Sequence, residues 1–224
     1  AGMIRQRAPK NCALHLFDLP GFNMTDRVQV TEVLKQLSPD VIINCAAFTN
    51  VDGAESQQEL AMSVNGAAVG YLAEVAQAVD ATLVHISTDY VFEGTGASPW
   101  HPNDTTAPQN AYGRSKPVGE IGIRASGAVH VILRTSWVVS AHGSNFVKTM
   151  LRLSETRDAL NVVGDQIGGP TPARDIASAC LQIVDQLMRD PSKSGTYHYS
   201  GTPDVSWADF ASTIFGQAGR SVTV

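Results

Sequence analysis

The chain has 224 residues, of which 43% are hydrophobic and 17% are charged. This composition supplies enough apolar material for a core and too little charge for a disordered chain. Sixteen Lys and Arg against twenty-one Asp and Glu give a formal net charge of −5 without any basic run, so nucleic acid is not expected as a partner. The longest apolar stretches, such as 41–48, are much shorter than the roughly 20 residues that span a bilayer, so no membrane partner is expected.

The residue types that form disulfides and metal sites are scattered along the chain. Cys12, Cys45 and Cys180 are odd in number and widely spaced in apolar surroundings, which predicts reduced thiols in the core of a cytoplasmic protein. The six histidines show neither an i, i+4 pair nor clustering with cysteine, so no metal site is expected.

The predicted elements alternate between helical and strand periods from the N-terminus onward. Residues 1–6 are typical of the helix that follows a glycine-rich turn, although no strand and no such turn stand before them. Apolar residues at i, i+3, i+4 and i+7 predict a helix over 26–37. Apolar β-branched runs at 41–47 and 82–87, joined by a long Ala-rich helix, predict a parallel strand–helix–strand crossover.

The second half of the chain continues the alternation. The expected elements are a helix at 112–124, a strand at 129–134, a helix near 146–153, a strand at 160–163, a helix from Thr171-Pro172 to about 189, a strand at 195–200, and a last helix capped by Ser206 and Asp209. This order predicts an α/β fold with a doubly wound, Rossmann-like parallel sheet that lacks its first strand and its C-terminal elements. We expect residues 1–165 to form a nucleotide-cofactor-binding domain that holds the catalytic residues, and residues 166–224 to form part of a smaller substrate-binding region.

Tyr112 and Lys116 stand at i and i+4 of a predicted helix, so a phenol and an ammonium share one face. A tyrosine with a pKa of about 10 is a poor acid or base near neutral pH, and a neighbouring cation favours its phenolate form. Lys116 is therefore expected to lower the pKa of Tyr112. Taken alone, the spacing favours the simpler interpretation, in which Tyr112 and Lys116 are an exposed amphipathic pair at the start of a helix without a catalytic role.

A second cluster of polar residues follows the predicted strand at 82–87. Ser87, Thr88 and Asp89 place two hydroxyls and a carboxylate at the carboxyl edge of a parallel sheet, where such folds bind ligands. A helix cap is the competing interpretation of Thr88, but the following residues lead into a loop. That loop, 93–110, is longer than most connections and is a candidate for function.

Two weaker signals concern the cofactor. Ala46, Ala47 and Phe48 end the strand at 41–47, and small residues there let a flat cofactor approach the backbone, although alanine is also a common core residue. Asp18 has two equally favoured interpretations: its carboxylate accepts hydrogen bonds from the hydroxyls of an adenosine ribose, or it is a turn residue before Pro20. The sequence contains no Gly-x-Ser-x-Gly motif, which argues against an α/β hydrolase.

Taken together, these motifs resemble the extended short-chain dehydrogenases/reductases and, within them, the dTDP-4-dehydrorhamnose reductase family. The resemblance runs in family order over nearly the whole chain. It is carried by Asn44 to Asp52, Ala54-Glu55, Ser87 to Phe92, Tyr112 to Lys116 with Gly119-Glu120, Arg134 to Val138, Asn145-Phe146, and Gln166-x-x-Gly169-Pro170-Thr171.

The resemblance implies reduction of the C4 keto group of dTDP-4-dehydro-L-rhamnose, with NADPH or NADH as cofactor. It makes Tyr112 the proton donor to the C4 oxygen, Lys116 the residue that holds the nicotinamide ribose, and Thr88 a partner of the reacting oxygen or of Tyr112. The other implied site residues are Asp18, Asn23, Met24, Ala46, Ala47 and Phe48 for the cofactor, and Asp89, Trp137, Gln166 and Thr171 for the dTDP-sugar.

Two other functions stay open. One is a nucleotide-sugar dehydratase or epimerase of the same superfamily, but a dehydratase needs a Glu after Thr-Asp, where this chain has Tyr90. The other is a catalytically silent, cofactor-binding regulatory subunit like the β subunit of methionine adenosyltransferase, against which the presence of both Tyr112 and Lys116 argues. The resemblance also implies a homodimer, and the sequence does not distinguish NADH from NADPH.

Overall fold

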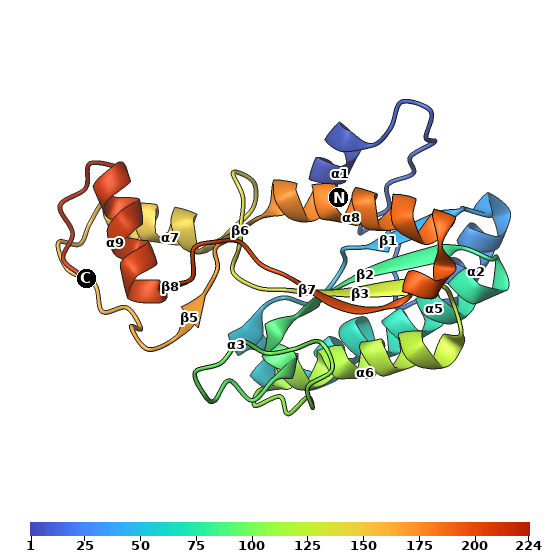
Figure 1. The fold of residues 1–224 in the computed structure, drawn as a ribbon, viewed down its shortest axis with the longest axis horizontal. Helices are drawn as coiled ribbons and strands as arrows, with labels where there is room; N and C mark the ends of the chain where they lie inside the picture. Colours follow the sequence, from blue (N-terminus) through green and yellow to red (C-terminus); the bar gives the residue numbers. More distant parts are fainter. The chain divides into compact units, whose positions relative to one another are not determined.

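A computed structural model describes residues 1–224, which divide into two compact units (Figure 1). The first unit comprises 1–134 and 178–198, and the second comprises 135–177 and 199–224. Each unit is therefore built from two separate stretches of the chain. The functional division into 1–165 and 166–224 stays a prediction.

The first unit is built on a four-stranded sheet. Its strands are β1 (Val41–Asn44), β2 (Thr82–Thr88), β3 (His130–Thr135) and β7 (Gly195–Tyr199), in the order β1-β2-β3-β7. β1 and β2 run parallel, with Val41 opposite Thr82 and Asn44 opposite His85. Nearly all of β2 is buried, as expected for a strand covered on both faces.

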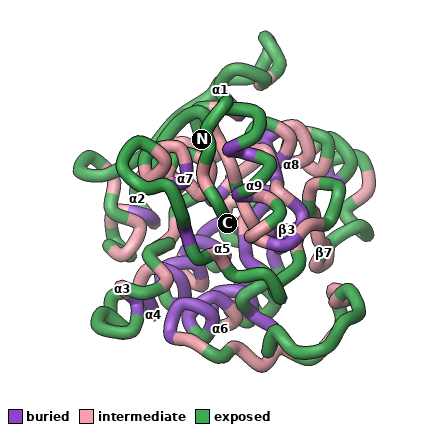
Figure 2. Tube along the Cα trace, turned by 90° about the vertical axis from the view of Figure 1, so that its left-hand side faces the viewer, coloured by how far each residue is buried: buried purple, intermediate pink, exposed green.

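Helices cover both faces of this sheet, which confirms the doubly wound α/β class. In Figure 1, α5 (Ala68–Ala78) and α6 (Ala111–Ser126) lie on one face and α8 (Ala173–Arg189) on the other. With α2 (Arg27–Leu37), α5 and α6 contribute to an apolar core that includes Val30, Leu34, Val69, Leu72, Leu83, Ile123 and Ile132. Buried residues accordingly concentrate along α5, α6 and β3 (Figure 2).

The connection between β1 and β2 differs from the single long helix that the sequence predicts. It consists of α3 (Val51–Ser56), α4 (Gln58–Met62), a π-helical turn at Ser63–Ala67, and α5. The π turn contains the buried Asn65, whose side chain bonds both backbone groups of Phe48. These side-chain bonds tie the π turn to the segment after β1, and the spacing of apolar residues does not reveal them.

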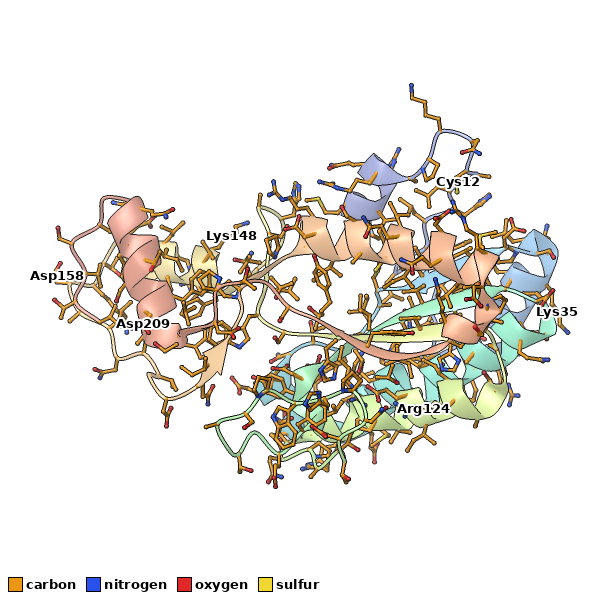
Figure 3. The ribbon with its side chains drawn as sticks, viewed as in Figure 1. Cys12, Lys35, Arg124, Lys148, Asp158 and Asp209 are labelled. Atoms are coloured by element: carbon orange, nitrogen blue, oxygen red, sulfur yellow. The ribbon has the colours of Figure 1, made fainter.

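The N-terminal segment begins with the expected helix, α1 (Gly2–Arg7), and continues without a strand to α2. The prediction that all three cysteines lie in the core is wrong. Cys12 and Cys45 are exposed and only Cys180 is buried; Figure 3 shows Cys12 in the segment after α1. The apolar neighbours of Cys12 do not bury it, because Leu14, Leu16 and Phe17 are themselves exposed. No helix has the length and apolar character needed to span a membrane.

The second unit has two small sheets and two helices. β4 (Val138–Val139) pairs in parallel with β6 (Thr171–Pro172), and β5 (Ile167–Gly168) pairs antiparallel with β8 (Val205–Ser206). α7 (Phe146–Leu153) and α9 (Trp207–Gln217) close around a core of Met150, Leu160, Ala211, Ile214 and Phe215.

Two predictions for this unit are wrong and one is confirmed. No strand forms at 160–163, where Leu160 instead packs into the helical core, and Ala159 makes only an isolated bridge to Thr223. Thr171-Pro172 is strand β6 and does not cap α8, because its backbone pairs with β4. Ser206 does cap α9, since its side chain accepts a hydrogen bond from the Asp209 amide.

The remaining regular elements are two short 3-10 turns. One, at Asp89–Val91, follows β2, and the other, at Pro191–Lys193, precedes β7.

Candidate active site

The site lies where the carboxyl end of β2 meets the beginning of α6. Asn110 caps α6 by accepting a hydrogen bond from the Gly113 amide at 2.7 Å, and Glu55 accepts one from the Ala111 amide at 2.7 Å. A Cβ at Gly113 would clash with the Tyr90 carbonyl oxygen. Only glycine at this position lets the first turn of α6 come this close to the turn after β2. This contact brings Tyr112 beside Thr88.

Tyr112 is 9% exposed and packs with Ala54, Ala61 and the half-buried Phe48. Burial raises the pKa of Tyr112 to about 12; a hydrogen bond with the Thr88 side chain lowers it, and the Asp89 charge raises it further. The expected lowering of this pKa by Lys116 is therefore not found. The physical reason is that loss of hydration penalises the phenolate and that the nearby charge is a carboxylate.

Thr88 and Asp89 lie next to each other at the end of β2. The Thr88 hydroxyl donates to Asp89 Oδ1 at 3.2 Å and accepts from the Tyr90 amide at 3.2 Å. Burial raises the pKa of Asp89, and hydrogen bonds from Thr88 and the backbone act in the opposite direction. Thr88 thus binds the carboxylate beside Tyr112 and also caps the turn at Asp89–Val91, so the two interpretations of Thr88 are compatible.

Lys116 is one turn further along α6 and is only 1% exposed. Its Nζ donates to the Ile86 carbonyl oxygen at 2.9 Å and lies 3.5 Å from Nε2 of His85. Burial lowers the pKa of Lys116 to about 8, while the negative charge of Glu120 raises it. The exposed amphipathic pair is therefore excluded, because both Tyr112 and Lys116 are buried.

Glu120 continues the i, i+4 spacing of Tyr112 and Lys116 and forms a buried ion pair. Its carboxylate accepts two hydrogen bonds from Arg134, at 2.9 and 2.6 Å, one from Ser87 at 2.7 Å and one from Arg124 at 2.9 Å. These bonds lower the pKa of Glu120 against the effect of burial. Figure 3 shows Arg124 on α6. The Tyr-Lys-Glu repeat on one helix face is the sequence signal that could have predicted this supporting role.

Arg134 also anchors the long loop 93–110. Its Nη1 donates to the Pro102 carbonyl oxygen at 3.1 Å, and its guanidinium lies over the Phe92 ring. Phe92 in turn stacks on Trp100 with ring centroids 4.8 Å apart. The loop is therefore held to the sheet by specific side chains beside the site.

The expected cofactor residues lie at two places in the first unit. At the end of β1, Ala46 is exposed and Ala47 and Phe48 are half-buried. Asn23 is exposed before α2, and Met24 packs against the main core. Asp18 is exposed and accepts a hydrogen bond from the next amide, that of Leu19, a local bond that leaves both of its interpretations open.

The expected sugar contacts Trp137, Gln166 and Thr171 belong to the second unit. Trp137 has a positive φ of 49° and stacks on Trp207 with ring centroids 3.4 Å apart. Thr171 is fully buried, and its hydroxyl donates to the Gly169 carbonyl oxygen at 2.8 Å and accepts from the Gly201 amide at 3.0 Å. Both hydrogen bonds of the Thr171 hydroxyl are thus made to the protein's own backbone. Gln166, in contrast, is exposed.

Comparison with known proteins points to one family. The sequence profile described as the RmlD substrate binding domain matches residues 1–223. A dTDP-4-dehydrorhamnose reductase of Aggregatibacter actinomycetemcomitans is 45% identical over 202 residues, which cover 90% of this chain and 69% of that protein.

Solved structures agree with this assignment. A dTDP-4-dehydrorhamnose reductase from Clostridium acetobutylicum superposes with a TM-score of 0.94 at 38% identity, covering 100% of this chain and 78% of that one. The reductase from Bacillus anthracis str. Ames, solved in complex with NADP, gives 0.93 at 38% identity with the same coverage. The chain therefore belongs to the dTDP-4-dehydrorhamnose reductase family.

Proposed function

We propose that this chain catalyses the NADPH- or NADH-dependent reduction of the C4 keto group of dTDP-4-dehydro-L-rhamnose to dTDP-L-rhamnose. The observation that carries the proposal is the buried group of Tyr112, Thr88 and Lys116 at the carboxyl edge of the sheet, in a chain of this family. The Bacillus anthracis relative was solved with NADP, which supports NADPH as the reductant.

The residues at this edge fit a dinucleotide in their chemistry. The first residues after β1, Cys45 and Ala46, are small and exposed, so the backbone can be approached closely there. Lys116 supplies a buried amine that can donate hydrogen bonds to ribose hydroxyls. We assign Ala46, Ala47 and Phe48, with Asp18, Asn23 and Met24, to the cofactor. When bound, the reduced nicotinamide supplies the hydride.

The chain's own residues supply the proton and the orientation. The Tyr112 phenol, kept protonated by its raised pKa, donates its proton to the C4 oxygen as negative charge develops there. Thr88 lies beside Tyr112, and its hydroxyl can turn from Asp89 to donate to the same oxygen. Asp89, Trp137, Gln166 and Thr171 are assigned to the dTDP-sugar, with Thr171 acting through the backbone that it holds in place.

The broader organisation is proposed on the family resemblance. Residues 1–165 bind the cofactor and hold the catalytic groups, and residues 166–224 contribute to substrate binding. The protein is a cytoplasmic homodimer. Light scattering coupled to size-exclusion chromatography would contradict the dimer by giving the mass of a monomer.

The test of the function is turnover of the purified protein. Consumption of NADPH or NADH, followed by the near-ultraviolet absorbance of the reduced nicotinamide, should require dTDP-4-dehydro-L-rhamnose. The product should be identified by mass spectrometry as the substrate plus two hydrogens. Cofactor binding without turnover would favour the regulatory-subunit alternative, and loss of water from the sugar would favour a dehydratase.

A further inference from the structure

His85 is a fully buried imidazole on β2 that the proposed reaction does not use. The parallel register of the sheet places it directly opposite Asn44 on β1. Its Nδ1 lies 3.0 Å from Nδ2 of Asn44, and its Nε2 lies 3.5 Å from Nζ of Lys116. The imidazole therefore separates a side-chain amide from the buried amine of the site.

The contacts of Asn44 determine which nitrogen of His85 carries the proton. Asn44 Oδ1 accepts a hydrogen bond from the Ala46 amide at 3.0 Å, so the NH₂ group of Asn44 faces His85. An NH₂ group only donates, so Nδ1 of His85 must present its lone pair. Complete burial is the main cause that holds the pKa of His85 well below its usual value. The ring is therefore neutral, with its single proton on Nε2.

This tautomer has a consequence for Lys116. An ammonium has three donors and no lone pair, so it cannot accept the Nε2–H of His85, whereas a neutral amine can. The Ile86 carbonyl oxygen accepts a hydrogen bond from either form of Lys116. The contact with His85 is therefore the one that distinguishes the two protonation states.

Few other charges act on the same amine. On α6 itself, Glu120 favours the ammonium, but this carboxylate is already paired with Arg134 of β3 and with Arg124. Tyr112, one turn earlier on α6, is neutral because its pKa is raised. No anion on β2 faces Lys116 to offset the N–H of His85.

We propose that His85 is a positioning residue that, with its tautomer fixed by Asn44, presents an N–H to Lys116 and favours the neutral amine over the ammonium. Its catalytic consequence rests on the proposed function. A Lys116 that exchanges its proton near neutral pH can donate a hydrogen bond to the cofactor ribose in either form and, as the neutral amine, can also accept one. Contacts through Asn44 and His85 thus connect the Ala46 backbone at the cofactor edge with the amine of Lys116.

The tautomer can be measured directly in the wild-type chain without cofactor. Imidazole ¹⁵N chemical shifts separate a protonated from an unprotonated ring nitrogen, and the signal of His85 is assigned by its loss in His85→Gln. We expect a protonated Nε2 and an unprotonated Nδ1 at neutral pH. A proton on Nδ1, or an imidazolium, would overturn the proposal.

Asn44→Asp tests the coupling to Lys116. Aspartate can still accept from the Ala46 amide, but it has no NH₂, so it accepts from His85 Nδ1–H and turns the Nε2 lone pair toward Lys116. The pKa of Lys116, measured by ¹³Cε titration among the five lysines, should then rise by about one unit or more, a tenfold change in its acid-dissociation constant.

The negative charge that Asn44→Asp adds is controlled in two ways. Asn145→Asp places the same charge change at the N-cap of α7 and should leave the pKa of Lys116 unchanged. In Asn44→Asp combined with His85→Leu, only the charge effect remains, so the rise should be clearly smaller than in Asn44→Asp alone. An equal rise with and without His85 would show that His85 has no such role.

Kinetics separates this inference from the proposed function. In a chain that turns over the keto sugar, the pH dependence of kcat should shift in the same direction as the pKa of Lys116 in Asn44→Asp. If the wild-type chain shows no turnover, the proposed function fails, while the tautomer and the lysine titration still decide the role of His85.

Discussion

Replacing Tyr112 with Phe removes the proposed proton donor and keeps the ring that packs beside Ala54 and Ala61. General acid catalysis contributes about 10²- to 10⁴-fold, which corresponds to about 2.7 to 5.4 kcal/mol of transition-state stabilisation. The change in the free energy of unfolding should be much smaller, at most the roughly 0.5 to 1.5 kcal/mol of one hydrogen bond, because the ring and its packing are kept. Thr88 also keeps its bonds to Asp89 and to the Tyr90 amide.

The assay is single-turnover reduction of dTDP-4-dehydro-L-rhamnose with saturating cofactor, so that the chemical step is observed. We expect Tyr112→Phe to lose about 10²- to 10⁴-fold in rate with little change in cofactor affinity and a small change in Tm. Tyr71→Phe is the matched control, since it removes a phenol from α5, outside the site. Retention of more than about a tenth of the wild-type rate by Tyr112→Phe would refute the assignment of the proton donor.

The pH dependence gives a second check on the same residue. A pKa of Tyr112 near 12 keeps the phenol protonated throughout the ordinary assay range. Ionisation of Tyr112 should therefore not lower kcat/KM, which reports groups of the free enzyme, until the pH approaches that value. A loss of rate with a midpoint near the usual tyrosine pKa of about 10, absent in Tyr112→Phe, would mean that the phenol is less protected from water than the structure shows.

The other predictions concern Lys116, Glu120 and Trp137. Lys116→Met removes a buried donor and should weaken NADPH binding by roughly 10- to 100-fold, measured by fluorescence titration; unchanged affinity would contradict its assignment to the ribose. Glu120→Gln leaves Arg134 without its buried partner and should destabilise the chain by about 3 to 5 kcal/mol at pH 7. Because the folded pKa of Glu120 is lowered, this stabilisation is complete above the unfolded value of 4.5 and is lost as pH falls through the folded pKa, so the two chains should converge in chemical denaturation at low pH. Trp137→Ala removes the stack on Trp207 and should lower the free energy of unfolding by about 1 to 3 kcal/mol while raising the KM for the dTDP-sugar. Trp137→Phe keeps a ring at this position. An equal loss of stability in both variants would contradict a stacking role.

Local sequence patterns determined the class of fold and most of the elements. The runs at 41–47 and 82–87 became the parallel pair β1 and β2, and the periodic stretch after Asn110 became α6, because hydrophobic periodicity reflects which residues face a core. Patterns shared with a known family also gave Tyr112, Thr88 and Lys116 as candidate site residues. Their side chains proved to be buried at one edge of the sheet.

Only the tertiary structure decided what depends on contacts between distant residues. The pKa of Tyr112 is raised, against the expectation from its i+4 lysine, because burial and the Asp89 charge outweigh that spacing. The exposure of Cys12 and Cys45 likewise depends on what packs over them and not on their apolar neighbours in sequence. The contact of His85 with Asn44 and Lys116 requires the register of two strands and the placement of α6. A linear pattern contains none of these distances, because they are set when the sheet and its helices pack together.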